Sequence, residues 1–126
     1  MANPRLNMNE EPNVLITAFI KPNMEGHVVK ALHDLPEFPG FTIDRIRGQG
    51  RGRGAGGQFH ATEYNFSYQE HLQMQIVCRE AISGEICSRI ARAAWTGSKG
   101  DGIIFTQVVK NFLRIRTDGK QGGAPE

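Results

Sequence analysis

The amino-acid sequence predicts an α+β sandwich, in which an antiparallel sheet is covered on one face by two helices. Four segments, residues 14–20, 41–47, 72–78 and 103–109, carry apolar residues in continuous runs or close to alternation, as strands do. Two segments between these strands instead repeat apolar residues with the 3.6-residue period of a helix. The length of 126 residues suits a single domain with one core.

The first half of the domain is predicted to run strand, helix, strand. Residues 14–20, VLITAFI, form a run rich in β-branched residues, which is typical of a central strand covered on both faces or nearly so. Pro22 and Asn23 start a helix, and the LPEFPG segment with its two prolines and its glycine ends it. Residues 41–47 then form the second strand. The helix has one apolar face, made of Met24, Val28, Ala31 and Leu32.

The second half is predicted to run strand, helix, strand again. In residues 72–78, apolar side chains alternate with mostly polar ones, so this strand is expected to bury one face. Residues 103–109 form the last long strand, and residues 113–117 form a short fifth strand or an edge segment. The helix between them has an apolar stripe made of Ile82, Ile86, Ile90 and Ala93.

The predicted order βαββαβ is that of the ferredoxin-like sandwich, with a long loop between the second and third strands. The sheet face without helices would be exposed in so small a monomer, so we expect oligomerisation through that face. Residues 1–13 are expected to be a disordered or weakly ordered N-terminal extension, residues 14–117 the domain, and residues 118–126 a polar C-terminal tail.

Composition narrows the class of protein. A formal net charge of only +2 gives too weak a field for a general nucleic-acid binder. The N-terminal residues lack the apolar core and cleavage site of a signal peptide, and no run approaches the roughly 18 apolar residues that span a bilayer. Cys78 and Cys87 lack metal-ligand spacing and are expected to be small apolar core residues. We therefore expect a cytoplasmic protein.

The most unusual segment is GQGRGRGAGG, residues 48–57, which contains six glycines and two arginines. Such glycine density excludes a packed helix or strand, and long loops inside compact domains usually have a function. Its match to the dinucleotide-binding pattern G-x-G-x-x-G carries little weight, because no helix follows it. RNA binding through Arg51 and Arg53 is a weaker alternative, because aromatic residues occur only at the far end of the segment.

A second glycine-rich segment, TGSKGDG at residues 96–102, is the better candidate for binding phosphate. Its three glycines leave backbone N–H groups free to face an anion. Arg114 and Arg116 are two positions apart, so in an extended segment both guanidinium groups project to the same side and suit phosphate oxygens. The alternative is a tight turn with two solvated surface arginines.

No pattern in the sequence indicates catalysis or a metal centre. Ser98 and Lys99 are adjacent, but no histidine or carboxylate is spaced to serve as an orienting base. The four histidines are scattered without the spacing of a ligand pair. We therefore expect neither an enzyme nor a resident metal ion.

From residue 14 to residue 117, the sequence resembles the PII signal-transduction family. The resemblance rests on an ordered set of short motifs at matching spacing: Lys21-Pro22, Gly48-Gln49-Gly50-Arg51, Glu63-Tyr64, TGSKGDGIIF at residues 96–105, and RIRT at residues 114–117. It implies a homotrimer that binds an adenine nucleotide, ADP or ATP, in clefts between subunits. It also implies that residues 50–66 form the T-loop, through which the family regulates a target transporter or enzyme in nitrogen metabolism.

The resemblance also assigns roles to individual residues. Contact with a partner falls on the T-loop residues Arg53, Phe59, His60 and Tyr64. Tyr64 matches the tyrosine that some members nucleotidylate, which makes it a candidate modification site. Membrane association is expected only through a partner. Nucleotide binding falls on Thr42, Gly48, Gly50, Arg51, Gly97, Gly100, Asp101, Gly102, Arg114 and Arg116.

Three positions depart from the family pattern around the nucleotide. Ile103 stands where the family usually has a lysine that reaches the phosphates, and Gly52 where a glutamine follows the loop's first arginine. His71 stands where a lysine pairs with 2-oxoglutarate. These departures predict weak selectivity for ATP over ADP and a weak or absent response to 2-oxoglutarate, and they leave the part of magnesium open. They also keep a second role open, in which a PII-like trimer regulates a metal-efflux or bicarbonate-linked system.

Overall fold

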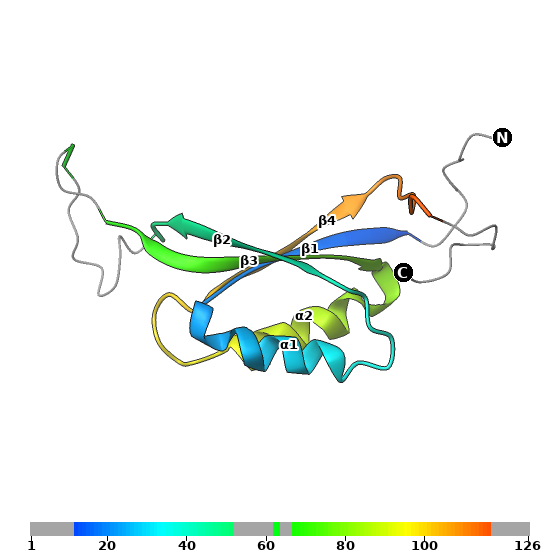
Figure 1. Ribbon diagram of the computed structural model, residues 1–126, viewed down its shortest axis with the longest axis horizontal. Helices are drawn as coiled ribbons and strands as arrows, with labels where there is room; N and C mark the ends of the chain where they lie inside the picture. The colour runs from blue at the N-terminus through cyan, green and yellow to red at the C-terminus, as the bar shows by residue number, and fades with distance from the viewer. Residues whose placement is uncertain (1–11, 52–61, 64–66, 117–126) are drawn as a thin grey trace.

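The computed structural model of the protein describes residues 12–51, 62–63 and 67–116. Within them, every predicted long element is present, in the predicted order (Figure 1). A helix does begin at Pro22, but its first turn is a 3₁₀ turn and the α-helix starts at Glu25. The elements are β1 (Asn13–Ile20), η1 (Pro22–Met24), α1 (Glu25–His33), β2 (Thr42–Gly48), β3 (Gln69–Arg79), α2 (Glu80–Ala94) and β4 (Gly102–Val109).

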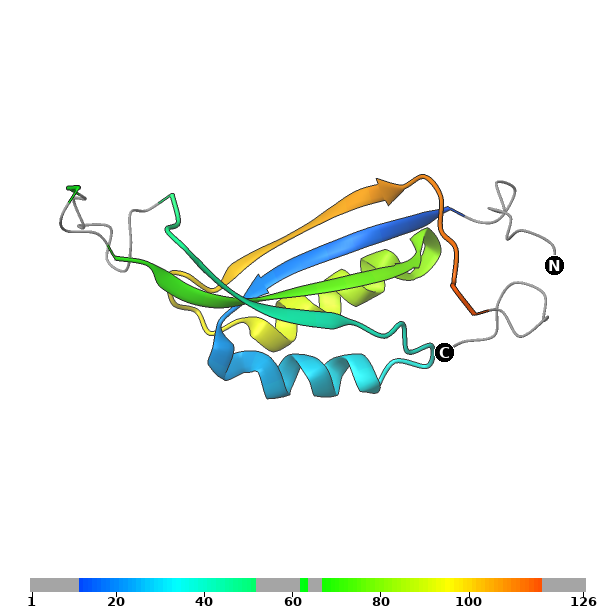
Figure 2. The ribbon, with the colours of Figure 1, turned by 45° about the horizontal axis from the view of Figure 1, so that its top comes forward.

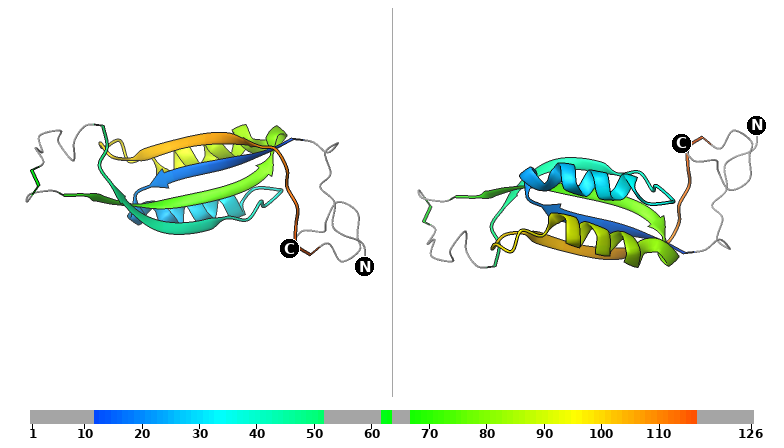
Figure 3. Two further views of the ribbon diagram at one scale, coloured as in Figure 1. Left: turned by 90° about the horizontal axis from the view of Figure 1, so that it is seen from above. Right: turned by 90° about the horizontal axis from the view of Figure 1, so that it is seen from below.

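The strands form one antiparallel sheet in the order β2-β3-β1-β4, and both helices lie on the same face of it (Figure 3). This is the predicted ferredoxin-like sandwich. Ile16 at the centre of β1 lies opposite Ile76 of β3 and Thr106 of β4, and β1 is paired over its full length with both neighbours. The other face of the sheet is left without helices, as the view from above in Figure 3 shows.

The core lies between the sheet and the helices. Ile16, Met74 and Ile90 are among its fully buried side chains, and each comes from a different element. Burying one such side chain stabilises the fold by about 1.5–3 kcal/mol. Cys78 is buried within this core, and burial raises the pKa of its thiol to about 11. Cys87 on α2 is half-buried, packed against the core, and both thiols are free.

Strand β1 is less covered than the sequence predicts. Alternate residues from Val14 to Ile20 are buried against the helices, whereas on the other face Thr17 is buried but Leu15 and Phe19 are only partly buried. Phe19 packs edge-to-face against Phe105 of β4, with 5.9 Å between ring centroids. The run is continuously apolar because both faces carry apolar residues, although helices cover only one of them. In α2 the predicted Ala93 is partly buried and packs against the core, and its neighbour Ala94 is buried as well.

The two ends of the sandwich carry different loops. At one end, β2 and β3 project toward the long loop that joins them, and residues 95–101 lie at the same end (Figure 1). At the opposite end, the segment after β4 crosses toward the connection between α1 and β2 (Figure 2). Of the two alternatives predicted for residues 113–117, the described part, 113–116, forms no strand. No helix in the described parts of the chain is long and apolar enough to cross a membrane.

Candidate functional site

The base of the long loop and the TGSKGDG segment lie together. Gly48, the last residue of β2, is paired with Gln69, the first residue of β3. Beyond this pair, the side-chain amide of Gln49 donates to the carbonyl oxygen of Ser67 at 3.4 Å and joins the two stems of the loop. The side chain of Gln69 lies so close to Gly100 that a Cβ on Gly100 would be 2.7 Å from Gln69 Nε2. The structure therefore brings two predicted nucleotide-binding segments to one place.

Backbone conformation explains the glycines of the TGSKGDG turn. Gly97, Gly100 and Gly102 have φ angles of 84°, 81° and 118°, which L side chains rarely adopt. At Gly102, a Cβ would also lie 1.8 Å from the carbonyl oxygen of Phe19, so the chain can enter β4 only through a glycine. The glycines are thus needed to build the turn, whatever the turn binds.

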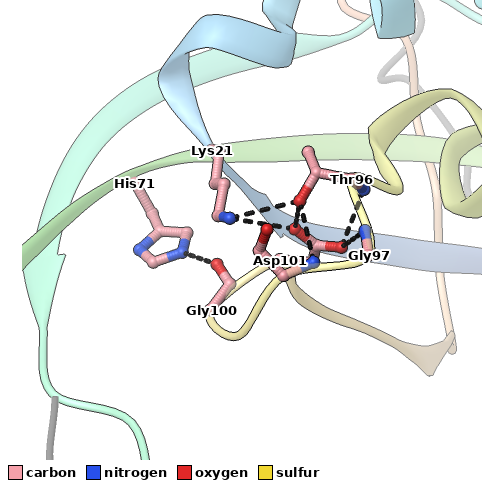
Figure 4. A network of polar contacts seen from close by, with 7 residues as sticks. Lys21, His71, Thr96, Gly97, Gly100 and Asp101 are labelled. Carbon is pink, nitrogen blue, oxygen red and sulfur yellow. Dashed lines mark hydrogen bonds and ion pairs between the residues drawn. The ribbon is translucent and has the colours of Figure 1, made fainter. Parts of the chain in front are cut away.

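Asp101 organises this turn from within (Figure 4). Its Oδ2 accepts hydrogen bonds from the backbone N–H of Thr96 at 2.8 Å and of Gly97 at 3.0 Å. Its Oδ1 accepts a hydrogen bond from the Thr96 hydroxyl and lies 3.1 Å from Lys21 Nζ. The donors of Thr96, aided by Lys21 and Gly97, hold the pKa of this carboxyl well below its usual range. Asp101 is therefore ionised at neutral pH.

Lys21 reaches this turn from the end of β1. Its Nζ lies 3.3 Å from Thr96 Oγ1 as well as beside Asp101, and only 19% of its side chain is exposed. Sequence reasoning noted Lys21 only as part of a family motif and assigned it no role. The one local signal was a lysine directly after a buried strand, and its partners are 75 and 80 positions away, which spacing does not reveal.

The structure also shows what two of the departing residues contact. His71 Nε2 lies 2.8 Å from the carbonyl oxygen of Gly100 (Figure 4). Because a carbonyl oxygen only accepts, Nε2 is the protonated nitrogen in this contact. Ile103 lies opposite Phe19 on the sheet, and 57% of it is exposed. Neither position offers the ammonium group that the family pattern has there.

A second group of predicted residues lines a hollow of about 450 Å³ at the other end of the molecule. Thr42 and Arg114 both line it, together with Gln75 from β3 and the aromatic rings of Phe38, Phe41 and Phe112. The guanidinium of Arg114 lies over the ring of Phe112, 5.2 Å from its centroid. Phe38 is also stacked on His33, with 4.3 Å between ring centroids. Arg116 is exposed and is not part of this lining.

The predicted nucleotide-binding residues therefore fall into two groups on one chain. Gly102 begins β4 and Arg114 follows its far end, and the eight residues of that strand span about 26 Å. A compact ligand on one chain cannot contact the glycine turn and Arg114 together. Gly50 and Arg51 belong with the turn, because they directly continue β2 beyond Gly48.

The remaining predicted residues cannot be placed in the same way. Arg53, Phe59, His60 and Tyr64 lie outside the described residues, as does Gly52. Within the described ranges, no group of three or more histidine, cysteine, aspartate or glutamate side chains could hold a metal ion.

Comparison with known proteins gives the family. The family model described as "Nitrogen regulatory protein P-II" matches residues 14–119. The nitrogen regulatory protein P-II of Rhodospirillum rubrum is 33% identical over 108 residues, which cover 86% of this chain and 95% of that protein. That of Azospirillum brasilense is 33% identical over 109 residues, covering 86% and 96%. The crystal structure of Arabidopsis thaliana PII bound to citrate shares the fold, with a TM-score of 0.70 and 22% identity over 94% of this chain and 97% of that one. The chain belongs to the nitrogen regulatory protein P-II family, whose members are signalling regulators of nitrogen metabolism rather than enzymes.

Proposed function

We propose that this protein is a homotrimeric regulator that binds ADP or ATP between subunits and switches its T-loop to control a partner protein in nitrogen metabolism. One observation carries the proposal. Residues expected at one nucleotide site form two separate groups, the glycine turn and the hollow that contains Thr42 and Arg114. A second copy of the chain, placing its hollow against the turn of the first, makes one complete site from two halves.

The hollow has the chemistry of a nucleoside pocket. Rings such as Phe38 and Phe41 offer apolar faces on which a base can stack. The Thr42 hydroxyl and the Gln75 amide supply both donors and acceptors for the polar edge of the base or for the ribose. Arg114 at the margin of the hollow supplies a guanidinium fork for phosphate oxygens.

The turn has the chemistry of a phosphate site. The N–H groups of Thr96, Gly97 and Ser98 are engaged inside the turn, so we expect the N–H groups that follow them, at Lys99 and Gly100, to face the anion. The positive φ of Gly100 brings this part of the backbone close to a ligand. Arg51 extends from the adjoining loop base, and Arg116 of the neighbouring copy lies two residues beyond Arg114. Phosphate bound here therefore contacts the base of the T-loop directly.

This contact couples the ligand to the T-loop. Phosphate held by Gly48, Gly50 and Arg51 favours the loop conformations that are compatible with that geometry. A partner that contacts Arg53, Phe59 and His60 then binds one set of conformations better than another. Nucleotidylation of Tyr64 would add a negative charge to the same loop.

The departures from the family pattern set the ligand preference. Ile103 gives the γ-phosphate no ammonium partner, so we propose that ATP binds little better than ADP. His71 replaces the family's lysine, and its Nε2–H is engaged by the carbonyl oxygen of Gly100, so we propose that this N–H is not available to a carboxylate of 2-oxoglutarate.

Calorimetric titration of the purified protein tests the ligands. ADP and ATP are titrated with and without magnesium, and each titration is repeated in the presence of 2-oxoglutarate. Binding of both nucleotides with similar affinity, unchanged by 2-oxoglutarate, is the expected result. Absence of nucleotide binding would refute the proposal, and micromolar 2-oxoglutarate affinity with MgATP would refute the ligand preference.

Mixed trimers test whether each site has two halves. Arg51→Ala damages the half with the turn, and Arg114→Ala damages the half with the hollow. Each pure variant is expected to bind ADP weakly. When the two are unfolded, mixed equally and refolded together, about a quarter of the interfaces carry two intact halves and regain binding. No recovery on mixing would place both arginines in the same half-site and contradict the proposed arrangement.

A further inference from the structure

The proposed phosphate site contains a carboxylate of its own. Asp101 lies between Gly100 and Gly102, at the centre of the turn that is proposed to receive an anion. An uncompensated carboxylate there would repel phosphate, because like charges at close range disfavour binding. The contacts of Asp101 explain how the turn can contain this carboxylate and still bind a phosphate.

Both carboxylate oxygens are satisfied inside the chain. Oδ2 accepts two backbone N–H groups, those of Thr96 and Gly97, and Oδ1 accepts from the Thr96 hydroxyl and from Lys21 (Figure 4). The Thr96 hydroxyl, which donates a hydrogen bond to Asp101, also accepts one from the backbone N–H of Ser98 at 3.2 Å. One ion pair therefore holds three consecutive residues of the turn, Thr96 to Ser98, in place.

Lys21 is positioned to neutralise Asp101 rather than to bind a ligand. Its Nζ is 3.1 Å from Asp101 Oδ1, and the exposed fractions of the two side chains are only 19% and 23%. Partly covered pairs are screened less by water than exposed ones, so their charges cancel effectively. The Lys21 ammonium has two oxygen partners within the protein, Asp101 and Thr96.

We infer that Lys21 and Asp101 are positioning residues of the nucleotide site: their ion pair fixes the glycine turn and removes the charge of Asp101, and neither side chain contacts the ligand. The inference rests on the proposed function, because it concerns the same site. It assigns Lys21 a role and changes that expected for Asp101, from a ligand to a support.

The first test compares two lysine variants that remove the same charge. Lys21→Met breaks the Lys21–Asp101 pair. Lys30→Met is the matched control, because Lys30 also pairs with an aspartate, Asp34, at 3.1 Å, but in an exposed pair on α1. Titration with ADP should give about tenfold weaker binding for Lys21→Met and less than twofold for Lys30→Met. Equally weakened ADP binding in both variants would show that only the net charge of the protein matters, and would overturn the inference.

The second test separates a positioning lysine from a ligand. The backbone amide signal of Gly97 in a ¹H–¹⁵N spectrum reports its bond to Asp101, and its movement with pH reports protonation of that carboxylate. Without nucleotide, Lys21→Met should shift this signal and raise the pH at which it titrates, whereas Lys30→Met should leave both unchanged. Weaker ADP binding by Lys21→Met with an unchanged Gly97 signal would show that Lys21 is a direct ligand.

A double variant provides the rescue. Asp101→Asn removes the negative charge but keeps a side-chain oxygen that can accept from the turn. Lys21→Met combined with Asp101→Asn should bind ADP several-fold better than Lys21→Met alone, because no bare carboxylate remains. If the wild type binds no nucleotide but the Gly97 signal changes in Lys21→Met as expected, the proposed function is wrong. The conclusion that the Lys21–Asp101 pair fixes the turn then still holds. Failure of the double variant to recover ADP binding, with wild-type binding intact, would overturn the inference.

Discussion

Substitution of Gly102 by alanine is predicted to damage both the fold and the site. Gly102 has φ 118°, and a Cβ added there would lie 1.8 Å from the carbonyl oxygen of Phe19. A non-glycine residue in this region of φ costs about 1–3 kcal/mol in strain. To relieve the overlap, the start of β4 must also move away from β1, which loses one or two ladder hydrogen bonds of about 1 kcal/mol each. Together these predict a loss of about 2–5 kcal/mol.

Gly84→Ala is a matched control, because the same substitution is expected to change the stability in the opposite direction. Gly84 lies inside α2, and a Cβ there would meet nothing within 4 Å. Alanine in a helix interior is favoured over glycine by about 0.5–1 kcal/mol, so this variant should be more stable than the wild type. The same chemical change is thus predicted to destabilise at one site and to stabilise at the other.

Urea unfolding followed by circular dichroism measures both variants. All samples are compared at one protein concentration, because the stability of an oligomer depends on it. With a denaturant slope of about 2 kcal/mol per molar, Gly102→Ala should lower the midpoint by roughly 1–2.5 M, and Gly84→Ala should raise it by about 0.3–0.5 M. A Gly102→Ala loss below about 1 kcal/mol would show that the turn does not approach Phe19 as the structure has it.

Three further predictions follow from single residues. Ile103→Lys should raise the affinity for ATP about tenfold relative to ADP in calorimetry, because it adds a charged donor beside the turn; equal gains for both nucleotides would contradict this. Ile90→Ala removes a fully buried side chain of α2 and should cost about 2–5 kcal/mol in urea unfolding, against less than about 0.5 kcal/mol for the exposed Ala91→Ser. Burial raises the pKa of Cys78 to about 11, so the stability that its thiol form contributes is complete below about pH 8.5 and is lost as the pH rises toward 11. Between about pH 8.5 and 11, the free energy of unfolding of Cys78→Ala, measured in urea, should therefore fall less with rising pH than that of the wild type. An equal fall in both proteins would show that other groups cause it.

The fold could be predicted because its signals are local. The stripe containing Val28 and Leu32 and the alternation from Leu72 to Cys78 depend on neighbours within a few positions, and the structure buries these residues as expected. Continuous apolar runs are less informative. The sequence of β1 cannot show whether its second face meets a helix, a partner or water, because all three can follow an apolar residue.

The site could be predicted only in its parts. The glycines of the turn were found because positive φ restricts residue type locally. The Lys21–Asp101 pair joins residues 80 positions apart, and it depends on how β1 and β4 are paired. The sharing of one hollow by Thr42 and Arg114 likewise depends on the path of the chain after β4. Both arise from tertiary packing, which neither spacing nor periodicity encodes.

The contact between Gln69 and Gly100 would connect the proposed phosphate site with the proposed T-loop. Gln69 is the first residue of β3 and is paired with Gly48, so it belongs to the stem of the loop. Its side chain also packs against the turn that is proposed to hold phosphate. Any movement of the turn on binding must therefore move Gln69 or separate the two. Gln49 carries such a shift across to Ser67 on the other stem, because its amide bonds that residue's carbonyl oxygen. A nucleotide bound as proposed could therefore act on the loop through its two stems, without contacting the residues between them.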